Sequence, residues 1–448
     1  MRTIFLLLIF AAILVATVGA PQAGVLGWTW LTLMDPHRLT WSFLTTAPLN
    51  MILAVVTLLS WFVSSQPKRL PLNLATGLWL CFIAWMTVTT VFSLAPDTAW
   101  IQWNFSIRVM LLGILVACLM TNQVRMQALI WVIVLSLGYF AVKGGGFTLV
   151  TGGGSHVLGP PGTELADNNN LALAFCMLLP LMNYLQMQSE WRLVRFGMVG
   201  AMGLTAVAIL GTYSRGGFVG LAIMGAYLWW KSKRKVAIAV VGLAMIVPAV
   251  KFMPETWTSR MSTIQSADSD ESFEGRVGAW QFALHLALDR PLGGGFNATE
   301  VRELADTYPS AWIRTYPPGR AAHSIYFEVL GDHGFIGLAL YLGLLATIWR
   351  YVAQARRAAK RRSDLAWAND LGTAIQVSLV AFVVCGALLS MAYYDLVYLL
   401  IGLSIALREL VRSAETSRQS SAATPQSGRS HRDELLPASI RAGYGPRP

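Results

Sequence analysis

The sequence predicts an all-α integral membrane protein with about twelve transmembrane helices, and two observations carry this prediction: its composition and its apolar segments. Of the 448 residues, 55% are hydrophobic and only 13% are charged, and the mean hydropathy is +0.53. An ordinary soluble domain carries about 25% charged residues. So few charges cannot cover the surface of a chain this long in water, which excludes a soluble globular protein.

Twelve apolar segments approach the roughly 20 residues that a helix needs to cross the hydrocarbon core of a membrane. They lie near 3–20, 44–63, 75–94, 104–121, 126–142, 170–187, 194–212, 216–230, 235–253, 334–352, 371–390 and 394–409. Residues 25–34 are too few to span, and we expect a re-entrant segment there. The first segment ends near Ala20 in a pattern resembling a signal-peptide cleavage site, but its length favours a retained helix.

Lysine and arginine residues gather in every second loop between these segments. The basic connections and tail contain Lys68, Arg69, Arg125, Arg192, Arg195, Lys231, Lys233, Arg234, Lys235, Arg350, Arg356, Arg357, Lys360, Arg361, Arg362, Arg408 and Arg412. Because short cytoplasmic loops are rich in Lys and Arg, this side is predicted to be cytoplasmic, with both termini there. The net charge of +11 is therefore interpreted as a topology signal and not as a nucleic-acid footprint.

The predicted spans divide the chain into five regions. They are N-terminal transmembrane helices with a first outer loop (1–165), central transmembrane helices with a Ser-Arg-Gly-Gly turn (166–253), a large outer loop with short helices (254–333), C-terminal transmembrane helices (334–410) and a disordered cytoplasmic tail (411–448). A loop as long as 254–333 indicates a function for it. We see no internal repeat or paired broken helices, which disfavours a transporter.

Four cations are predicted at the outer ends of helices, where positive charge is unexpected: Arg108, Lys143, Arg215 and Lys251. For Lys143 and Lys251, anchoring to lipid headgroups and donor binding both remain open, with anchoring favoured. Arg215 lies in a tight turn with Gly216 and Gly217. Glycines let backbone amides approach a ligand closely, and a guanidinium beside free amides at a helix start suits a phosphate.

The large outer loop contains further candidates. A helix is predicted over 276–289, with Arg276 in its first turn, where a cation opposes the helix dipole; a bound anion or the neighbouring Glu274 would compensate. The glycine run at 291–295 is interpreted as a phosphate cradle or as a flexible turn. His323 begins an apolar stretch, where it is either a packed histidine or a base that takes a proton from a sugar hydroxyl.

The sequence offers little support for a metal site or a cofactor. Asp268 and Asp270 have the spacing used by metal-dependent glycosyltransferases, but their acidic, serine-rich flanks favour a solvated loop. The four cysteines all fall in apolar segments without metal-ligand spacing, and no two histidines have chelating spacing. We therefore expect no metal and no cofactor.

Taken together, these residues resemble the motifs of the O-antigen ligase / O-antigen polymerase superfamily. The matching motifs, in the family's order, are Ser214-Arg215-Gly216-Gly217, Gly275-Arg276 with Trp280, Pro291-Leu-Gly-Gly-Gly295-Phe, and His323-Ser324 with Gly331 and Gly334. The resemblance covers about residues 165–400. The N-terminal part, including 35–38, is similar to exosortase-associated O-glycosylation ligases, so the acceptor stays open between lipid A–core, a protein and a glycan.

The resemblance implies transfer of a glycan from undecaprenyl pyrophosphate to an acceptor hydroxyl at the periplasmic face of the bacterial inner membrane. It implies a GT-C-like helical bundle that contacts membrane lipids and binds no nucleic acid. Arg215 and Arg276 would hold the pyrophosphate, and His323 would activate the acceptor. Other substrate contacts are assigned to Gly216, Gly217, Arg108, Arg320 and Ser324.

Arginines in a pocket of low dielectric can stabilise the leaving pyrophosphate without a divalent ion. Attack opposite that leaving group predicts inversion at the anomeric carbon. The favoured reading is an O-antigen ligase that modifies lipid A–core in lipopolysaccharide biosynthesis. The alternatives are a protein O-glycosylation ligase or a polymerase with the same donor and, more distantly, a polysaccharide transporter or flippase.

Overall fold

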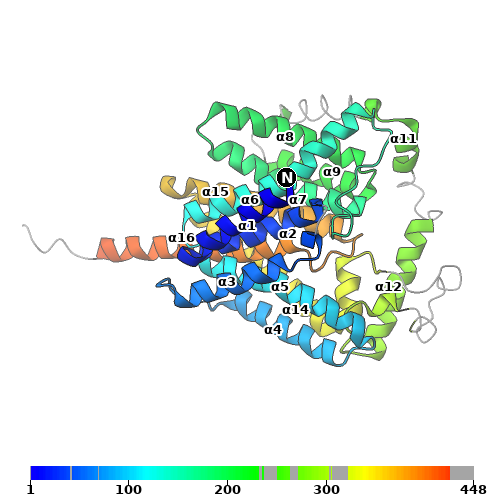
Figure 1. Cartoon of the computed structure of the whole chain (residues 1–448), viewed down its shortest axis with the longest axis horizontal. Coiled ribbons are helices and arrows are strands. Elements are labelled where there is room, and N and C mark those ends of the chain that lie inside the picture. Colours follow the sequence, from blue (N-terminus) through cyan, green and yellow to red (C-terminus); the bar gives the residue numbers. More distant parts are fainter. Residues whose placement is uncertain are drawn as a thin grey trace, which may run out of the picture.

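The computed structural model describes residues 2–40, 43–68, 70–231, 235–236, 250–262, 271–301, 304 and 321–423, and these residues form helices and turns without a strand. Figure 1 shows a bundle in which most helices run side by side. The helices are α1 (Arg2–Gly19), α2 (Pro21–Met34), η1 (Pro36–Leu39), η2 (Phe43–Thr45), α3 (Leu49–Val63), α4 (Leu74–Val91), α5 (Pro96–Leu119), α6 (Gln123–Val150), α7 (Asn168–Gln188), α8 (Arg192–Gly211), α9 (Arg215–Lys231), α11 (Glu255–Ser262), α12 (Glu271–Asp289), η4 (Ala298–Glu300), α14 (Ile325–Ala359), η5 (Ser363–Leu365), α15 (Ala366–Gly386) and α16 (Asp395–Ala423).

Eight helical segments in the described part of the chain are long and apolar enough to cross a membrane. They are α1, α4, α5, α6, α7, α8, α14 and α15 with the turn before it. The shorter α3, and α9 and α16, occupy three further predicted segments. The prediction of an all-helical fold with membrane-spanning helices is confirmed. The count of twelve is not tested, because most of the segment 235–253 lies outside the described residues.

Small residues allow the helix backbones to approach closely, as in other membrane bundles. A Cβ atom on Gly145 of α6 would lie 2.2 Å from the carbonyl oxygen of Leu204 in α8, and one on Gly402 of α16 would lie 2.1 Å from that of Gly113 in α5. The glycines at 144–146 therefore lie within α6 and do not end it. The predicted span 126–142 is too short, since α6 continues to Val150.

The first two helices form an antiparallel hairpin that turns at Ala20. A Cβ on Gly24 would lie 2.6 Å from Thr17 Cγ2, and one on Gly27 would lie 2.4 Å from Ile13 Cγ2, so α2 runs back along α1. Ser60 Oγ, near the end of α3, donates to the carbonyl oxygen of Thr17 at 2.6 Å. The ends of α1 and α3 therefore lie together.

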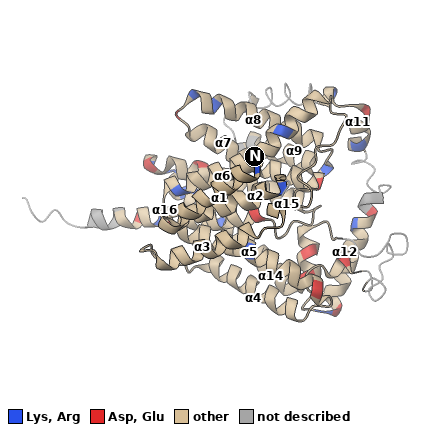
Figure 2. Cartoon of the chain, in the orientation of Figure 1, with Lys and Arg blue, Asp and Glu red and all other residues tan. Residues whose placement is uncertain are grey.

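The hairpin turn lies at the end of the bundle where the predicted basic loops meet. Gln66 Nε2 donates to Gln22 Oε1 at 2.7 Å, and Arg125 Nη1 donates to Gln66 Oε1 at 3.0 Å. We call this the basic end; Figure 2 shows further Lys and Arg there on the turn between α7 and α8. We call the other end, where α9 begins, the Arg215 end; Figure 1 shows α11 and α12 on that side and α16 projecting from the opposite side.

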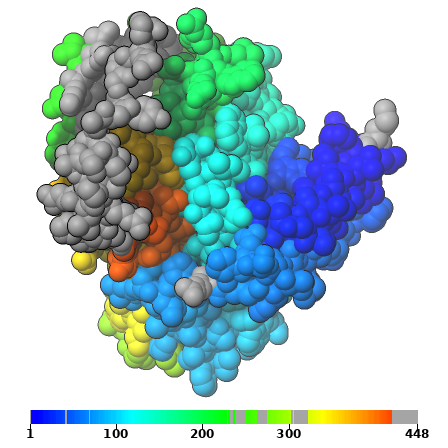
Figure 3. All heavy atoms as spheres, turned by 90° about the vertical axis from the view of Figure 1, so that its left-hand side faces the viewer, coloured from blue at the N-terminus to red at the C-terminus, as the bar shows by residue number. Residues whose placement is uncertain are grey.

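The direction of α1 disagrees with one expectation. Since α1 ends at the basic end, it begins toward the Arg215 end, whereas α16 runs to the basic end. Both termini were predicted on one side because residues 21–34 were not counted as a chain reversal. Only 17% of α1 is buried, and the space-filling view shows it at the periphery of the molecule (Figure 3).

Candidate active site

The turn before α9 presents Arg215 at the first residue of that helix. Ser214 caps the helix, because its Oγ accepts from the amide of Gly217 at 3.1 Å. Tyr213 has a φ of +58°, a left-handed conformation that costs energy for a side-chain-bearing residue and is enriched at functional sites. The Ser214 cap and the left-handed Tyr213 thus fix the backbone of the turn between α8 and α9, and with it the position of Arg215.

The two glycines after Arg215 pack against neighbouring helices. Cys176 Sγ of α7 lies 3.5 Å from the carbonyl oxygen of Gly217, and Cys385 Sγ of α15 lies 3.4 Å from that of Gly216. A Cβ on Gly217 would lie 2.6 Å from Ala172 Cβ. Because the Gly217 amide already donates to Ser214, its contacts in this structure are structural; substrate binding by either glycine remains a proposal.

A second arginine, which the sequence analysis missed, lies at the same turn. Arg260 of α11 donates through Nε to the carbonyl oxygen of Tyr213 at 3.1 Å. Trp257 of the same helix donates to the carbonyl oxygen of Leu210 at 3.0 Å. Its position in the sequence could have identified it, because Arg260 is a further cation in the large loop 254–333 that was predicted to lie outside.

His323 lies in the short segment that leads into α14. Its φ is +45°, its side chain is exposed, and its backbone amide donates to Ser390 Oγ at 2.8 Å. The following Ser324 is buried and precedes the first residue of α14. A strained backbone that is tied to the bundle holds an accessible imidazole in place, which is the arrangement that a catalytic base needs.

Arg276 lies on α12, one helical turn before Trp280. Trp280 Nε1 donates to the carbonyl oxygen of Ala322 at 2.8 Å, directly before His323. The Trp280 ring also stacks on Phe327 of α14, with 5.1 Å between centroids. Residues four apart share a helix face, so Arg276 lies on the face of α12 that meets the His323 segment.

The start of α12 corrects one expectation about Arg276. The helix begins at Glu271, five residues earlier than predicted, so Arg276 lies in the second turn. The helix dipole acts mainly within the first turn, and that turn holds Glu271 and Glu274. The prediction that Arg276 lies in the first turn and opposes the helix dipole is therefore wrong.

The end of α15 joins the Arg215 turn to the His323 segment. On one side Cys385 contacts Gly216. On the other side a Cβ on Gly386 would lie 3.0 Å from Ile325 Cδ1, and Tyr326 OH donates to the carbonyl oxygen of Val383 at 3.0 Å. The end of α15 therefore lies between the Arg215 turn and the His323 segment, and α12 with Arg276 packs against the His323 segment at the same end of the bundle.

The remaining predicted site residues do not share this position. Arg108 is on α5, where its Nε donates to the carbonyl oxygen of Asn104 at 2.8 Å, and it lines a separate cavity. Lys143 is exposed within α6 and Lys251 is exposed before α11. Arg320 lies outside the described residues. So do Asp268 and Asp270; within the described ranges no group of three His, Cys, Asp or Glu could hold a metal ion.

The glycine run at 291–295 packs against a kink in α14. Gly334, at the kink, has a φ of +66°, and a Cβ there would lie 2.0 Å from the carbonyl oxygen of Pro291. The amides of Gly294 and Gly295 donate to the carbonyl oxygens of Gly331 and Asp332 at 2.8 and 2.9 Å. These contacts favour the turn over the phosphate cradle.

A buried polar network, which the sequence analysis also missed, supports the residues after α15. Glu328 Oε2 accepts from the amide of Ala392 at 3.0 Å, and Tyr393 OH donates to Asp332 Oδ2 at 3.1 Å. His333 Nδ1 lies 2.7 Å from Thr89 Oγ1 of α4. Since buried polar groups need partners, the first two bonds tie α14 to the segment that binds the His323 backbone, and the third ties α14 to α4.

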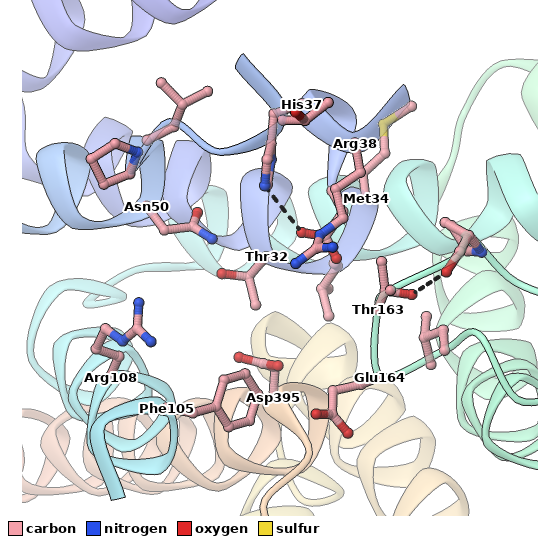
Figure 4. A pocket seen from close by; sticks show the side chains of 18 of the residues that line it. Thr32, Met34, His37, Arg38, Asn50, Phe105, Arg108, Thr163, Glu164 and Asp395 are labelled. Atoms are coloured by element: carbon pink, nitrogen blue, oxygen red, sulfur yellow. Dashed lines mark hydrogen bonds and ion pairs between the residues drawn. The ribbon is translucent and has the colours of Figure 1, made fainter. Parts of the chain in front are cut away.

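A cavity of about 640 Å³ lies beside this network, at the Arg215 end. Its walls come from the end of α2 with η1, residues 45–47 with the start of α3, α5, α6, residues 160–165 and the start of α16, and Figure 4 shows the cavity from close by. His37 Nε2 lies 3.8 Å from Asp35 Oδ1. The sequence analysis assigned only Arg108 among its lining residues to substrate, because six separate segments form it.

Burial and neighbouring charge set the pKa values of the loop residues in this cavity. Burial, with Glu164 adding, raises the pKa of Asp35 from 3.8 to about 6, although Arg38 opposes this. Burial and then Arg38 lower the pKa of His37. Burial, followed by Glu300, raises the pKa of Glu164. His37 is therefore neutral near pH 7, while Asp35 gains a proton within the mildly acidic range.

Comparison with known families divides the chain into two parts. Residues 200–342 match the family described as "O-Antigen ligase", and residues 1–190 match a "Family of unknown function (DUF5935)". No curated protein matches the chain. The first match contains Arg215, Arg276 and His323, whereas most of the cavity wall comes from the second.

Proposed function

Since the chain belongs to the O-antigen ligase superfamily, we propose that it is a ligase that transfers a glycan from undecaprenyl pyrophosphate to lipid A–core. The family match supports a membrane glycosyltransferase of the ligase or polymerase type. The eight apolar helices support a multi-pass membrane protein. Donor, acceptor and roles of individual residues belong to the proposal.

One observation carries the proposal: the end of α15 contacts the segments with Arg215 and His323, and the helix with Arg276 packs against the His323 segment. The bonds from Trp280 to Ala322 and from His323 to Ser390, with the contact between Cys385 and Gly216, support this arrangement. Two guanidinium groups and an imidazole at one end of a bundle suit a reaction that needs both an anion site and a base.

In the proposed reaction, the acceptor hydroxyl attacks the anomeric carbon of the lipid-linked glycan. A carbon–oxygen bond forms to the acceptor, the bond to the pyrophosphate oxygen breaks, and the anomeric configuration inverts. His323 takes the hydroxyl proton. Arg215 and Arg276 stabilise the negative charge that develops on undecaprenyl pyrophosphate, which is the main electrostatic demand of the step.

We place this site on the periplasmic side of the bacterial inner membrane. The short basic turns, such as that with Arg192 and Arg195, lie at the opposite end of the bundle, and such turns face the cytoplasm in most membrane proteins. On this assignment α16 leads the C-terminal tail into the cytoplasm. The hairpin of α1 and α2 puts the start of α1 on the periplasmic side.

Reconstitution tests the function directly. The purified protein in lipid vesicles receives lipid-linked glycan together with lipid A–core, a candidate protein acceptor or a second lipid-linked glycan. We expect modification of lipid A–core. Exclusive extension of the lipid-linked glycan would identify a polymerase, and exclusive modification of protein a protein O-glycosylation ligase. Unchanged glycans with movement across the vesicle membrane would identify a flippase.

The requirement for a divalent ion is tested in the same assay. Because the proposed charge stabilisation comes from arginines, EDTA is expected to leave the initial rate within about two-fold of the untreated rate. The control is EDTA with excess Mg²⁺ or Mn²⁺ restored. Loss of transfer with EDTA and recovery with the ion would instead favour a role for Asp268 and Asp270.

A further inference from the structure

The cavity of about 640 Å³ at the Arg215 end has no role in the transfer step proposed above. Its volume falls within the range of about 300–1,000 Å³ that is typical of small-molecule sites. Residues 390–395 connect the cavity to the His323 segment, because Ser390 binds the His323 amide while Tyr394 and Asp395 line the cavity. A ligand in the cavity would therefore lie next to the transfer site.

Buried polar atoms without partners belong to residues in the wall of this cavity. His37 and Tyr394 are only 8% and 3% exposed. Among the described residues, His37 Nδ1, Tyr394 OH and Asn50 Oδ1 have no hydrogen-bond partner. Figure 4 shows the His37 ring and the Asn50 amide directed into the cavity. An unsatisfied buried polar atom costs free energy and is rare in native proteins, so three around one cavity indicate a ligand with hydrogen-bonding groups.

The charges around the cavity indicate which ligand fits. Three carboxyl groups line it, together with two guanidinium groups; the five residues are Asp35, Glu164, Asp395, Arg38 and Arg108. Figure 4 shows Arg108 and Arg38 on different walls, with Glu164 and Asp395 facing the same space. A phosphate would be repelled by the carboxylates. A sugar hydroxyl both donates and accepts, so it can satisfy carboxylates, guanidinium groups and neutral polar atoms together.

The shape of the cavity is fixed by unusual backbone conformations. Asp35 has a φ of +46° between α2 and η1. Gly162 has a φ of +73°, and a Cβ there would lie 2.6 Å from Arg38 Nη1. The positive φ favours glycine at this position, and the absence of a side chain leaves room for the Arg38 guanidinium. Phe105 adds an aromatic ring to the wall (Figure 4), and such a ring can pack on the apolar face of a sugar.

We propose that this cavity is a subsite that holds neutral, hydroxyl-rich sugar residues of a glycan substrate beside the transfer site. The proposal rests on the function proposed above, because the cavity would hold part of one of the two glycans that take part in the transfer reaction. The sugars come either from the acceptor or from the donor glycan. In both cases the cavity determines which glycan the protein accepts.

Binding of lipid-free oligosaccharides tests the subsite without transfer. The probes are the oligosaccharide released by mild acid from the lipid-linked donor, the core oligosaccharide released from lipid A, and inorganic pyrophosphate. Each is titrated into the purified full-length protein by calorimetry. The variants are Tyr394→Phe and Asn50→Ala, with Tyr139→Phe and Asn183→Ala as controls, because Tyr139 and Asn183 are exposed and are not among the residues that line the cavity.

We expect Tyr394→Phe and Asn50→Ala each to raise the Kd of one oligosaccharide about 10-fold, as for the loss of a buried hydrogen bond. The oligosaccharide affected identifies the source of the sugar. Tyr394→Phe removes a hydroxyl without a partner among the described residues, so the thermal midpoint of the free protein should not fall. Pyrophosphate binding and both controls should match the unmodified protein.

Three results would overturn the proposal: no binding of either oligosaccharide to the unmodified protein, unchanged Kd values in both variants, or weakened binding of pyrophosphate alone. The transfer assay separates this proposal from the proposed function. If both variants transfer glycan with unchanged KM values for the two glycans, the result contradicts the subsite but not the proposed function. If an oligosaccharide binds in a way that depends on Tyr394 but no acceptor is modified, the result contradicts the proposed function but not the subsite.

Discussion

At the scale of single residues, strained backbone conformations coincide with the functional candidates. Tyr213, beside Arg215, His323 itself and Asp35 in the cavity all have positive φ values. Such conformations cost about 1–3 kcal/mol each for residues other than glycine. They persist here because neighbouring contacts fix them, such as the bond from the His323 amide to Ser390.

The raised pKa of Asp35 predicts a pH-dependent stability. The folded state holds its proton up to about pH 6, whereas the unfolded chain loses it near 3.8. The stabilising contribution is thus fully present below about pH 4 and lost as the pH rises through about 6. In Asp35→Asn this loss should be absent.

Thermal unfolding of both proteins between pH 4 and 7.5 measures this effect. The midpoint of Asp35→Asn minus that of the unmodified protein should increase as the pH rises. Asp97→Asn, on an acidic residue exposed at the start of α5, is the control. A difference for Asp35→Asn that does not change with pH would contradict the assignment.

The proposed pyrophosphate clamp predicts that lysine cannot replace Arg215. A guanidinium presents a planar fork that binds two phosphate oxygens, whereas an ammonium acts as a point charge. Arg215→Lys should lower kcat for transfer about 10-fold or more. Arg192→Lys, at the basic end, is the matched control; equal activity of both variants would argue against a bidentate contact.

At the scale of helices, the spans were predictable because their apolar runs are long. The hairpin of α1 and α2 was missed because α2 has only 14 residues, too few for a span. The end of α6 was missed because three glycines at 144–146 suggested a loop. Only the packing shows that Gly145 lies against the backbone of Leu204.

The contact at Gly145 predicts a matched pair of substitutions. In Gly145→Ala the new Cβ would lie 2.2 Å from a backbone oxygen of α8, so the two helices must separate. Overpacking of this kind costs about 1–3 kcal/mol. A Cβ on Gly146 meets nothing within 4 Å.

The thermal midpoint of the purified protein should therefore fall for Gly145→Ala. For Gly146→Ala it should stay the same or rise, because alanine favours helix over glycine. Equal midpoints for the two variants would mean that α6 and α8 do not pack as described.

At the scale of the whole molecule, the direction of α1 sets the sidedness of the chain. Residue 2 and residue 255 are expected on the side of the candidate active site, and residue 190 on the basic side. Arg2, Glu190 and Glu255 are all exposed. Single cysteines at these positions, with Cys81 replaced by Ser because it is exposed, report on which side each lies.

A membrane-impermeant maleimide applied to spheroplasts should label Arg2→Cys and Glu255→Cys. Glu190→Cys should react only after lysis. The protein with Cys81→Ser alone is the background control. Labelling of Glu190→Cys but not Glu255→Cys in spheroplasts would invert the topology, and labelling of Arg2→Cys only after lysis would contradict the hairpin.

The sequence motifs identified three residues of the candidate active site but not their surroundings. Arg215, Arg276 and His323 were recognised from their local motifs. The links through Trp280, Ser390 and Cys385 join residues that are 42 to 169 positions apart, so spacing could not predict them. The cavity with Tyr394 was missed for the same reason, since its wall combines six segments.

The central claim is that His323 acts as the base beside an arginine site for the pyrophosphate. The most direct measurement is the initial rate of glycan transfer to lipid A–core by purified His323→Ala and Arg276→Ala at saturating donor and acceptor, compared with His285→Ala, which alters an exposed histidine on α12. The account predicts that loss of the base lowers the rate about 10²–10⁴-fold, that Arg276→Ala also lowers it, and that His285→Ala retains it. A normal rate for folded His323→Ala would contradict the account.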